Sequence, residues 1–147
     1  MIWPIPHFWI IDIGESVLEK RAKKNQAHYG VDIHCDAGTP VLAAMAGVVK
    51  AVVDGRKSGK SVTRAAGLFV EIDDNKDYIF RYLHLGECEV QTGQDVSEGL
   101  CLGTVADAYT SGLAKRPHLH FEIRHRTADG GIGGAVDPLR LLPPRRA

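Results

Sequence analysis

Histidine dominates the possible chemistry of this chain, which has seven histidines in 147 residues. His118 and His120 lie two residues apart in a stretch where polar and apolar residues alternate. This alternation predicts a strand that projects both rings from one face, with their Cα atoms about 7 Å apart. One ring could bind a metal ion while the other lies beside it. Standing alone, the pair would be better explained as two histidines on the solvated face of a half-buried strand.

A second candidate pair, His28 and Asp32, brackets Gly30. Imidazole nitrogen and carboxylate oxygen are both ligands of zinc, with bonds of about 2 Å. A straight strand would hold the two residues about 13 Å apart, which is too far for one ion. Gly30 can adopt backbone angles that are closed to other residues, so we expect a bend there that brings the pair together.

His84 lies in a third alternating stretch, Tyr82-Leu83-His84-Leu85. The alternation predicts that Tyr82 and His84 share one face of a strand, opposite Leu83 and Leu85. By itself this pattern indicates only a polar face, and it is compatible with a structural histidine. Together with the two pairs above, it completes a set of five zinc-compatible ligands and bases. Their joint presence favours a metal site.

The elements that position these residues are expected to be mainly strands. The 16 glycines separate short stretches rich in Val, Ile, Leu and Tyr, a rhythm typical of strands joined by turns. We predict strands over residues 40–53, 68–73, 78–85, 89–90, 100–105 and 118–124. One short peripheral helix is predicted over residues 15–25. Residues 54–66 and 106–117 are predicted to be surface loops, because they are polar and contain glycine.

Length and composition indicate a single domain. A chain of 147 residues with 44 % hydrophobic content can fill one core, with residues 1–14 as a lead-in and 139–147 as a tail. The 18 basic and 18 acidic residues balance, so we expect no nucleic-acid partner. The N-terminal stretch lacks a basic region and contains prolines, which predicts neither a signal peptide nor a transmembrane segment. The three cysteines form no C-x-x-C motif and are expected to be free thiols.

The order of the motifs resembles the lysostaphin or LytM-type zinc metallopeptidase family. The matching stretches are H-x-G-x-D at 28–32, G-T-P-V at 38–41, Y-L-H-L at 82–85, G-Q-D-V at 93–96, H-L-H-F-E-I at 118–123 and V-D-P at 136–138. The similarity covers nearly the whole chain. Each motif alone is weak, but the three histidine motifs in this order are highly specific.

The resemblance implies roles for the five positions. His28, Asp32 and His120 match the ligands of one zinc ion (Zn2+) per chain. His84 and His118 match the catalytic pair beside the zinc-activated water, where they would accept and return protons. The resemblance does not say which of these two histidines is the general base.

The resemblance also implies a fold and an activity. The expected fold is mainly β and of the duplicated hybrid motif type, in which an antiparallel sheet with few short helices forms a groove with loop walls. The implied activity is hydrolysis of peptide bonds in bacterial peptidoglycan, in cross-links or stem peptides, by a monomeric zinc endopeptidase. Tyr82 and Tyr109 are expected to contact this substrate.

Two segments depart from the family pattern. The family often has Gly-x-Thr-Gly ahead of H-L-H, where this chain has A-D-A-Y-T-S-G at 106–112, and residues 14–26 replace an aromatic-Gly-x-Arg stretch. We therefore expect one groove wall and the cleavage specificity to differ. The remaining candidates, His7, His34, Cys35 and His125, are predicted to have structural or surface roles.

Two other classes of function are compatible with parts of the sequence. The chain could be a catalytically silent member of the same fold that binds the wall or activates another hydrolase. It could also be a phosphocarrier domain of the sugar phosphotransferase type, although such a domain has no need of the His118-x-His120 pair. Because no export signal is visible, we expect a peptidase made in the cytoplasm that reaches the cell wall by release or delivery, as a phage lysin or secreted cargo would.

Overall fold

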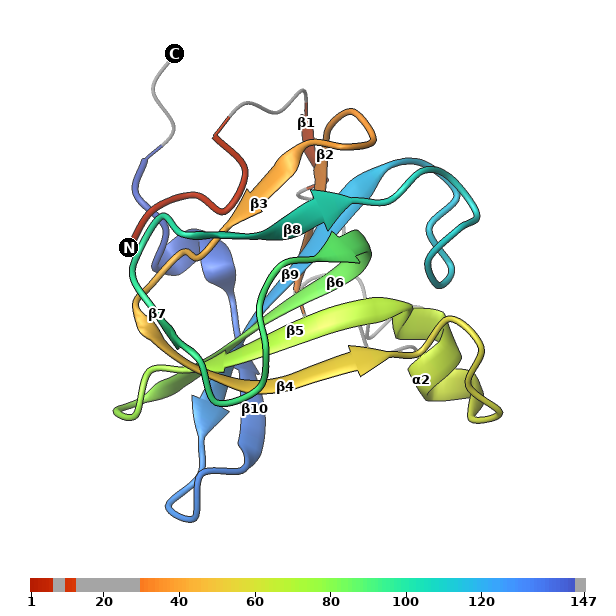
Figure 1. Ribbon diagram of the computed structural model, residues 1–147. Helices are drawn as coiled ribbons and strands as arrows, with labels where there is room; N and C mark the ends of the chain where they lie inside the picture. The colour runs from red at the N-terminus through yellow and green to blue at the C-terminus, as the bar shows by residue number, and fades with distance from the viewer. Residues whose placement is uncertain (7–9, 13–29, 145–147) are drawn as a thin grey trace, which may run out of the picture.

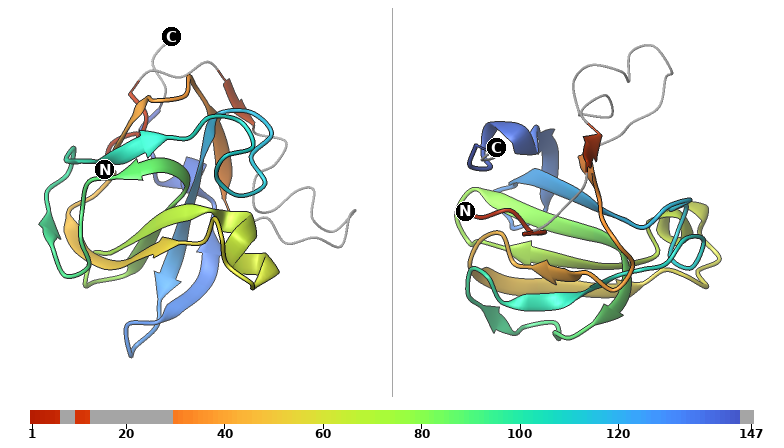
Figure 2. Two further views of the ribbon diagram at one scale, coloured as in Figure 1. Left: turned by 45° about the vertical axis from the view of Figure 1, so that its right-hand side comes forward. Right: turned by 90° about the horizontal axis from the view of Figure 1, so that it is seen from above.

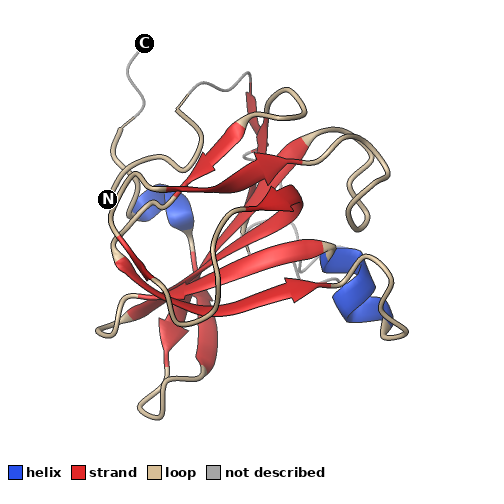
Figure 3. Ribbon diagram, in the orientation of Figure 1, coloured by secondary structure: helices blue, strands red, loops and turns tan. Residues whose placement is uncertain are grey.

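The computed structural model describes residues 1–6, 10–12 and 30–144, and strands make up most of it (Figure 1; Figure 3). The strands are β1 (Ile10–Asp12), β2 (Val31–His34), β3 (Pro40–Leu42), β4 (Gly47–Asp54), β5 (Leu68–Asp73), β6 (Tyr78–Cys88), β7 (Asp95–Val96), β8 (Cys101–Val105), β9 (His118–Arg126) and β10 (Ile132–Val136). The described helices are the short α2 (Ser61–Ala66) and the 3-10 helix η2 (Pro138–Arg140). The expected mainly β class is confirmed.

The strands form one antiparallel sheet that runs in the order β1-β2-β9-β6-β5-β4-β7. β10 adds to β9, and β8 joins β6 to β3. β9 and β6 are therefore the central strands. β9 pairs with β2 over His118–Phe121 and with β10 over its second half, so the histidine end of β9 is flanked by β2 on one side and β6 on the other.

β9 separates polar and apolar side chains as its alternation predicts. Leu119, Phe121 and Ile123 are fully buried in the core on one face, while His118 and His120 project from the other. The core continues under the neighbouring strands through buried residues that include Val31, Ile33, Val70, Ile72, Phe80, Tyr82 and Leu102. The opposite face of the same strands carries the candidate site.

β6 contains a β-bulge at the point where it changes partner. Leu68 pairs with Leu85 and Val70 pairs with Tyr82, so Leu83 and His84 together oppose a single residue of β5. Up to Leu83 the strand pairs with β9, and from Leu85 onward it pairs with β8. His84 has a left-handed backbone, φ +67°, which is uncommon outside glycine. The chain turns at this residue from one half of the sheet to the other.

The bulge overturns the predicted alternation of this stretch. Tyr82 is fully buried in the core, whereas Leu83 and His84 both lie on the groove face. The prediction that Tyr82 and His84 share a face is therefore wrong, because the extra residue shifts the side-chain register by one position.

Other element boundaries also differ from the predicted ones. The run over 40–53 is two strands, β3 and β4, separated by a turn, and residues 89–90 are not a strand. Part of the predicted loop 54–66 is helical, since α2 occupies Ser61–Ala66. β1, β2, β7 and β10 were not predicted as strands. The helix expected over residues 15–25 lies outside the described residues.

The two ends of the described chain lie close together on one side of the sheet (Figures 1 and 2). Ile5 and Leu142 are both buried in the core, and Trp3 Nε1 donates a hydrogen bond of 2.9 Å to Pro143 O. Both segments thus pack onto the domain. Within the described residues, no helix is long and apolar enough to span a bilayer.

Candidate active site

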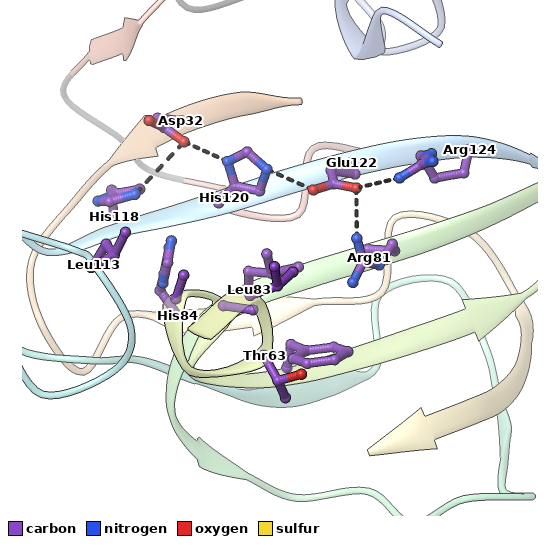
Figure 4. A pocket seen from close by; sticks show the side chains of 14 residues that line it. Asp32, Thr63, Arg81, Leu83, His84, Leu113, His118, His120, Glu122 and Arg124 are labelled. Carbon is purple, nitrogen blue, oxygen red and sulfur yellow. Dashed lines mark hydrogen bonds and ion pairs between the residues drawn. The ribbon is translucent and has the colours of Figure 1, made fainter. Parts of the chain in front are cut away.

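The candidate site is built on two residue pairs that face each other across β2 and β9. Asp32 pairs directly with His120, and His34 with His118. Asp32 Oδ1 accepts a hydrogen bond of 2.8 Å from His120 Nδ1, and His118 Nε2 lies 3.6 Å from the same oxygen. Strand alternation buries Val31 and leaves Asp32 on the opposite face. The carboxylate and both imidazoles therefore converge at one point (Figure 4).

His84 reaches the same point from β6. Its ring centroid lies 5.0 Å from that of His118 and 6.1 Å from that of His120. Its Nδ1 lies 2.9 Å from Ser111 O, while His118 Nδ1 lies 2.8 Å from Arg116 O. Because a carbonyl oxygen can only accept, both Nδ1 atoms carry the proton, and a neutral ring then keeps its lone pair on Nε2. Both histidines thus have an Nε2 that can accept a proton.

A buried ion network holds His120 from the other side. Glu122 Oε2 accepts a hydrogen bond of 2.8 Å from His120 Nε2, and its Oε1 accepts one of 2.9 Å from Arg81 and one of 3.3 Å from Arg124. Arg81 also donates to Glu71, at 2.7 Å, and lies over the ring of Phe69. His120, Glu122 and Arg124 from β9 and Arg81 from β6 form a continuous row of side chains (Figure 4).

The network shifts the ionisation of its members. Burial disfavours the charged ring of His120, but its hydrogen bonds to Asp32 and Glu122 outweigh burial and raise its pKa to about 9. Burial also opposes the charge on Glu122, yet His120 and Arg81 lower its pKa to about 2. Asp32 is likewise held below its usual pKa, against burial, by His120, His118 and His84. Without a metal ion, His120 is an imidazolium between two carboxylates.

The pKa values of the two other histidines move the opposite way. Burial, reinforced by the charges of His118 and His120, lowers the pKa of His84 to about 4. Burial also lowers the pKa of His118, against the attraction of Asp32. Both rings are consequently neutral near pH 7, the form in which an imidazole can act as a base.

One wall of the groove is apolar. It is lined by side chains from α2, from the loop 106–117 and from β5 and β6, namely Val62, Ala65, Ala66, Phe69, Leu83 and Leu113. Val62 and Leu113 are 84 % and 75 % exposed, so the rim of this wall is open to a ligand. The groove therefore combines a polar row at its base with an uncharged wall.

The structure brings four of the seven predicted site residues together in the groove. Asp32, His84, His118 and His120 all line it. His28 lies outside the described residues, so its role as a ligand stays a prediction. Among the described residues, no group of three or more His, Cys, Asp or Glu side chains is arranged to hold a metal ion.

Both tyrosines stand apart from the groove lining. Tyr82 is fully buried, and its hydroxyl accepts a hydrogen bond of 2.9 Å from Ala44 N, so the expectation that it contacts substrate is wrong. Tyr109 is 77 % exposed on the loop 106–117 and is absent from the residues that line the groove. Its contact with substrate stays a prediction.

Gly30 is bent as predicted, and whether the bend brings His28 to Asp32 stays a prediction because His28 lies outside the described residues. The φ of Gly30 is outside the left-handed range. A Cβ added here would lie 2.2 Å from Phe121 O, so glycine is required because β9 passes directly against it. Gly30 therefore permits the close pairing of β2 with β9.

The donor set fits zinc. A carboxylate oxygen and an imidazole nitrogen already lie 2.8 Å apart in the Asp32–His120 pair, and both become zinc ligands once the proton on His120 Nδ1 is displaced. Glu122 on the remote nitrogen of His120 is the arrangement that commonly orients a zinc-binding histidine.

Sequence reasoning missed several site residues. Glu122 follows the same alternation as His118 and His120, so its place on the groove face could have been predicted. Arg81, Ser111 and Val62 gave no local signal, because their positions depend on long-range strand and loop contacts.

The other singled-out residues have simple surroundings. His125 is exposed and lies against Tyr78, and His34 lies beside His118 with ring centroids 5.4 Å apart. Cys35, Cys88 and Cys101 are free thiols, as expected.

Comparison with known proteins agrees with this geometry. The model of peptidase family M23 matches residues 26–138. The chain is 31 % identical over 137 residues to the uncharacterized lipoprotein YgeR of Escherichia coli, covering 93 % of this chain and 48 % of that protein. It is 38 % identical over 97 residues to the peptidoglycan DD-endopeptidase ShyC of Vibrio cholerae, covering 66 % and 20 %. The chain spans less than half the length of both relatives.

Solved structures show the same fold. Lysostaphin from Staphylococcus simulans aligns with a TM-score of 0.63 and 28 % identity, covering 78 % of this chain and 43 % of that one. A zinc-containing peptidase from Vibrio cholerae aligns with a TM-score of 0.58 and 32 % identity, covering 68 % and 28 %. The antiparallel β domain of this chain, with its histidine-lined groove, thus has the fold of these two peptidases. The chain belongs to peptidase family M23, and this match gives the phosphocarrier alternative no support.

Proposed function

We propose that this protein is a zinc-dependent endopeptidase that hydrolyses peptide bonds in bacterial peptidoglycan, in cross-links or stem peptides. The observation that carries the proposal is the convergence of Asp32, His120, His118 and His84 at the base of one groove. Similarity to a peptidoglycan DD-endopeptidase supports the substrate class.

Zinc would be held by His28, Asp32 and His120. When bound there, the ion supplies Lewis-acid polarisation of the scissile carbonyl and a water of lowered pKa. The described residues supply the rest of the arrangement. Asp32 contributes negative charge next to His118, and Glu122 fixes the ring plane of His120.

His118 and His84 would move the protons. Each has its Nδ1–H held by a backbone carbonyl, so each ring is fixed with Nε2 as the acceptor. One Nε2 can take a proton from the attacking water, and a protonated ring can return it to the leaving amine. The depressed pKa values keep both rings neutral at the start of this cycle.

The apolar wall bears on the substrate. Val62, Leu113 and Leu83 present an uncharged surface beside the polar base of the groove. Alanyl methyl groups would bury apolar area against this wall, whereas a glycine bridge offers none. We therefore expect alanine-containing, directly cross-linked peptides to be preferred over glycine bridges.

We further propose that the domain acts as a monomer on the cell wall after leaving the cytoplasm. The relatives in Escherichia coli and Pseudomonas aeruginosa are named as lipoproteins, which supports action outside the cytoplasmic compartment.

The test measures zinc and cleavage in the same preparations. The wild-type protein should contain about one zinc per chain and release peptides from purified walls, and His120→Ala should lose both properties. His125→Ala is the matched control, because His125 is an exposed histidine on the same strand that packs on Tyr78.

Digestion of two wall chemotypes, one directly cross-linked and one with glycine bridges, identifies the bond by mass spectrometry of the fragments. Wild-type protein that binds zinc and leaves both walls intact would make the silent, wall-binding alternative the better description. Cleavage that survives in His120→Ala would overturn the proposal.

A further inference from the structure

Two loops meet directly above His84. One is the segment 55–67 between β4 and β5, which carries α2, and the other is the segment 106–117 between β8 and β9. Both lie at the same end of the sheet in every view (Figures 1 and 2). Leu113 N donates to Ala65 O at 3.1 Å, and Leu68 N donates to Ser111 Oγ at 3.0 Å. We call this pair of contacts the loop clasp.

The loop clasp ends on the His84 ring. Ser111 is 1 % exposed, and its two oxygens have separate partners. Its Oγ accepts from Leu68 N at the start of β5, while its carbonyl accepts from His84 Nδ1 at 2.9 Å. Ser111 thus ties the ring of His84 to the edge of the loop 55–67.

The packing around the clasp leaves no space for an added side chain. Gly67 and Gly112 both have left-handed backbones, with φ of +72° and +71°. A Cβ on Gly112 would lie 2.2 Å from Ala65 O and 2.8 Å from His84 Nδ1, and a Cβ on Gly67 would lie 2.3 Å from Ser111 Oγ. Glycine at both positions is what lets the loops approach each other and the ring.

We infer that the loop clasp is a positioning device, in which Ser111, supported by Gly67 and Gly112, holds His84 in the Nδ1–H tautomer with Nε2 facing the groove. This inference rests on the proposed function, in which His84 handles a proton. An imidazole on a bulged strand could otherwise rotate about its side-chain bonds, and a ring turned over would offer a donor where an acceptor is needed. The bulge brings His84 to the groove, and the clasp sets its orientation.

The inference assigns a role to the loop 55–67. Residues of α2 need not touch the reacting atoms to affect catalysis, because Ala65 and Leu68 fix the loop that carries Ser111. Changes that break the hydrogen bonds to Leu113 N or Ser111 Oγ should therefore alter kcat more than KM, whereas Val62 of the same loop belongs to the substrate wall.

The main test compares Ser111→Ala with Thr110→Ala. The first removes the acceptor for Leu68 N and loosens the Ser111 carbonyl. The second removes a hydroxyl of the same loop that donates to Asp107 O within that loop. For Ser111→Ala we expect kcat to fall about tenfold, KM to stay within about twofold, and zinc content to be unchanged. Thr110→Ala should match the wild type.

A spectroscopic measurement tests the mechanism without turnover. Nitrogen-15 chemical shifts of the His84 ring, recorded on the zinc-loaded protein, should show a single Nδ1–H tautomer in the wild type and a mixture in Ser111→Ala. This readout also separates the two proposals, because it applies even if the wild type fails to cleave peptidoglycan. The inference would be overturned if the His84 ring of Ser111→Ala kept a single Nδ1–H tautomer. It would also be overturned if the wild type is active and Ser111→Ala has the same kcat.

A second pair of variants guards against a general folding effect. Gly112→Ala places a methyl group against His84, whereas Gly93→Ala imposes the same left-handed strain, φ +89°, with no atom within 4 Å. Gly112→Ala should lose more stability because of its clash with Ala65 O, so kcat is compared per folded molecule, and a lower value only in Gly112→Ala supports the clasp. An equal kcat in the two variants contradicts it.

Discussion

Asp32 Oδ1 and His120 Nδ1 lie 2.8 Å apart because the two residues are directly paired across β2 and β9. The geometry of this pair therefore depends on how closely the two strands approach. Gly30 sets that approach, since it precedes β2 and lies against the Phe121 carbonyl.

Replacing Gly30 should open the Asp32–His120 pair. In Gly30→Ala the new Cβ would lie 2.2 Å from Phe121 O, so β2 must move away from β9. We expect a loss of stability of about 1–3 kcal/mol and a fall in zinc affinity of about tenfold or more. Urea unfolding and chelator competition measure the two effects. Gly134→Ala, which adds a Cβ with nothing within 4 Å, should change neither. A zinc affinity in Gly30→Ala equal to that control would show that strand spacing does not set the site.

Glu122 should tune zinc binding through His120. In Glu122→Gln the charge that orients the ring and increases its basicity is removed, while the side-chain shape is kept. Zinc affinity should fall by about 10–100-fold. Glu71→Gln is the control, because Glu71 shares Arg81 with Glu122 but does not contact His120. An equal loss of affinity in both variants would assign the effect to the ion network as a whole.

Tyr82 should matter for stability and not for turnover. Tyr82→Phe removes the acceptor of Ala44 N and leaves a buried donor unpaired, at a cost of about 1–3 kcal/mol. Because the side chain is fully buried, kcat/KM per folded molecule should match the wild type. Chemical denaturation and peptide-release kinetics provide the comparison. A change in KM at unchanged stability would restore Tyr82 as a substrate contact.

The zinc-free protein should lose stability as the pH rises from about 6.5 to about 9. The folded-state pKa of His120 is raised to about 9, so its charged form stabilises the fold fully below its ordinary pKa of 6.5. That contribution disappears as the pH passes through the folded-state pKa, with a slope of at most about 1.4 kcal/mol per pH unit for one proton. Urea unfolding in the presence of a chelator measures the slope, and subtraction of the His120→Gln profile isolates it. Parallel profiles for the two proteins would contradict this origin.

The sequence was most informative where structure depends on local periodicity. The faces of β9 follow directly from alternation, so His118 and His120 could be placed together, and Glu122 with them. The strand order could not be derived from alternation, and the fold class rested on resemblance as much as on composition.

The errors arose where distant segments decide the local conformation. The bulge at His84 exists because β6 must pair with β5, β9 and β8 along its length, and no residue of Y-L-H-L signals a change of partner. Likewise, the helix at Ser61–Ala66 lies inside the longer polar stretch 54–66, which predicted a loop. The requirement for glycine at position 30 comes from the Phe121 carbonyl, which lies far away in sequence.

The bulge in β6 also bears on how such domains can vary over evolution. Because it adds one residue, Tyr82 and Leu85 both face the core although they are three positions apart, and Leu83 and His84 both face the groove. Deletion of Leu83 would leave Tyr82 and Leu85 facing the core and His84 facing the groove, but it would remove the bulge at which β6 changes partner from β9 to β8, whereas many substitutions at Leu83 would keep it. Drift in this family should therefore tolerate changes of side chain in this strand far better than changes of length.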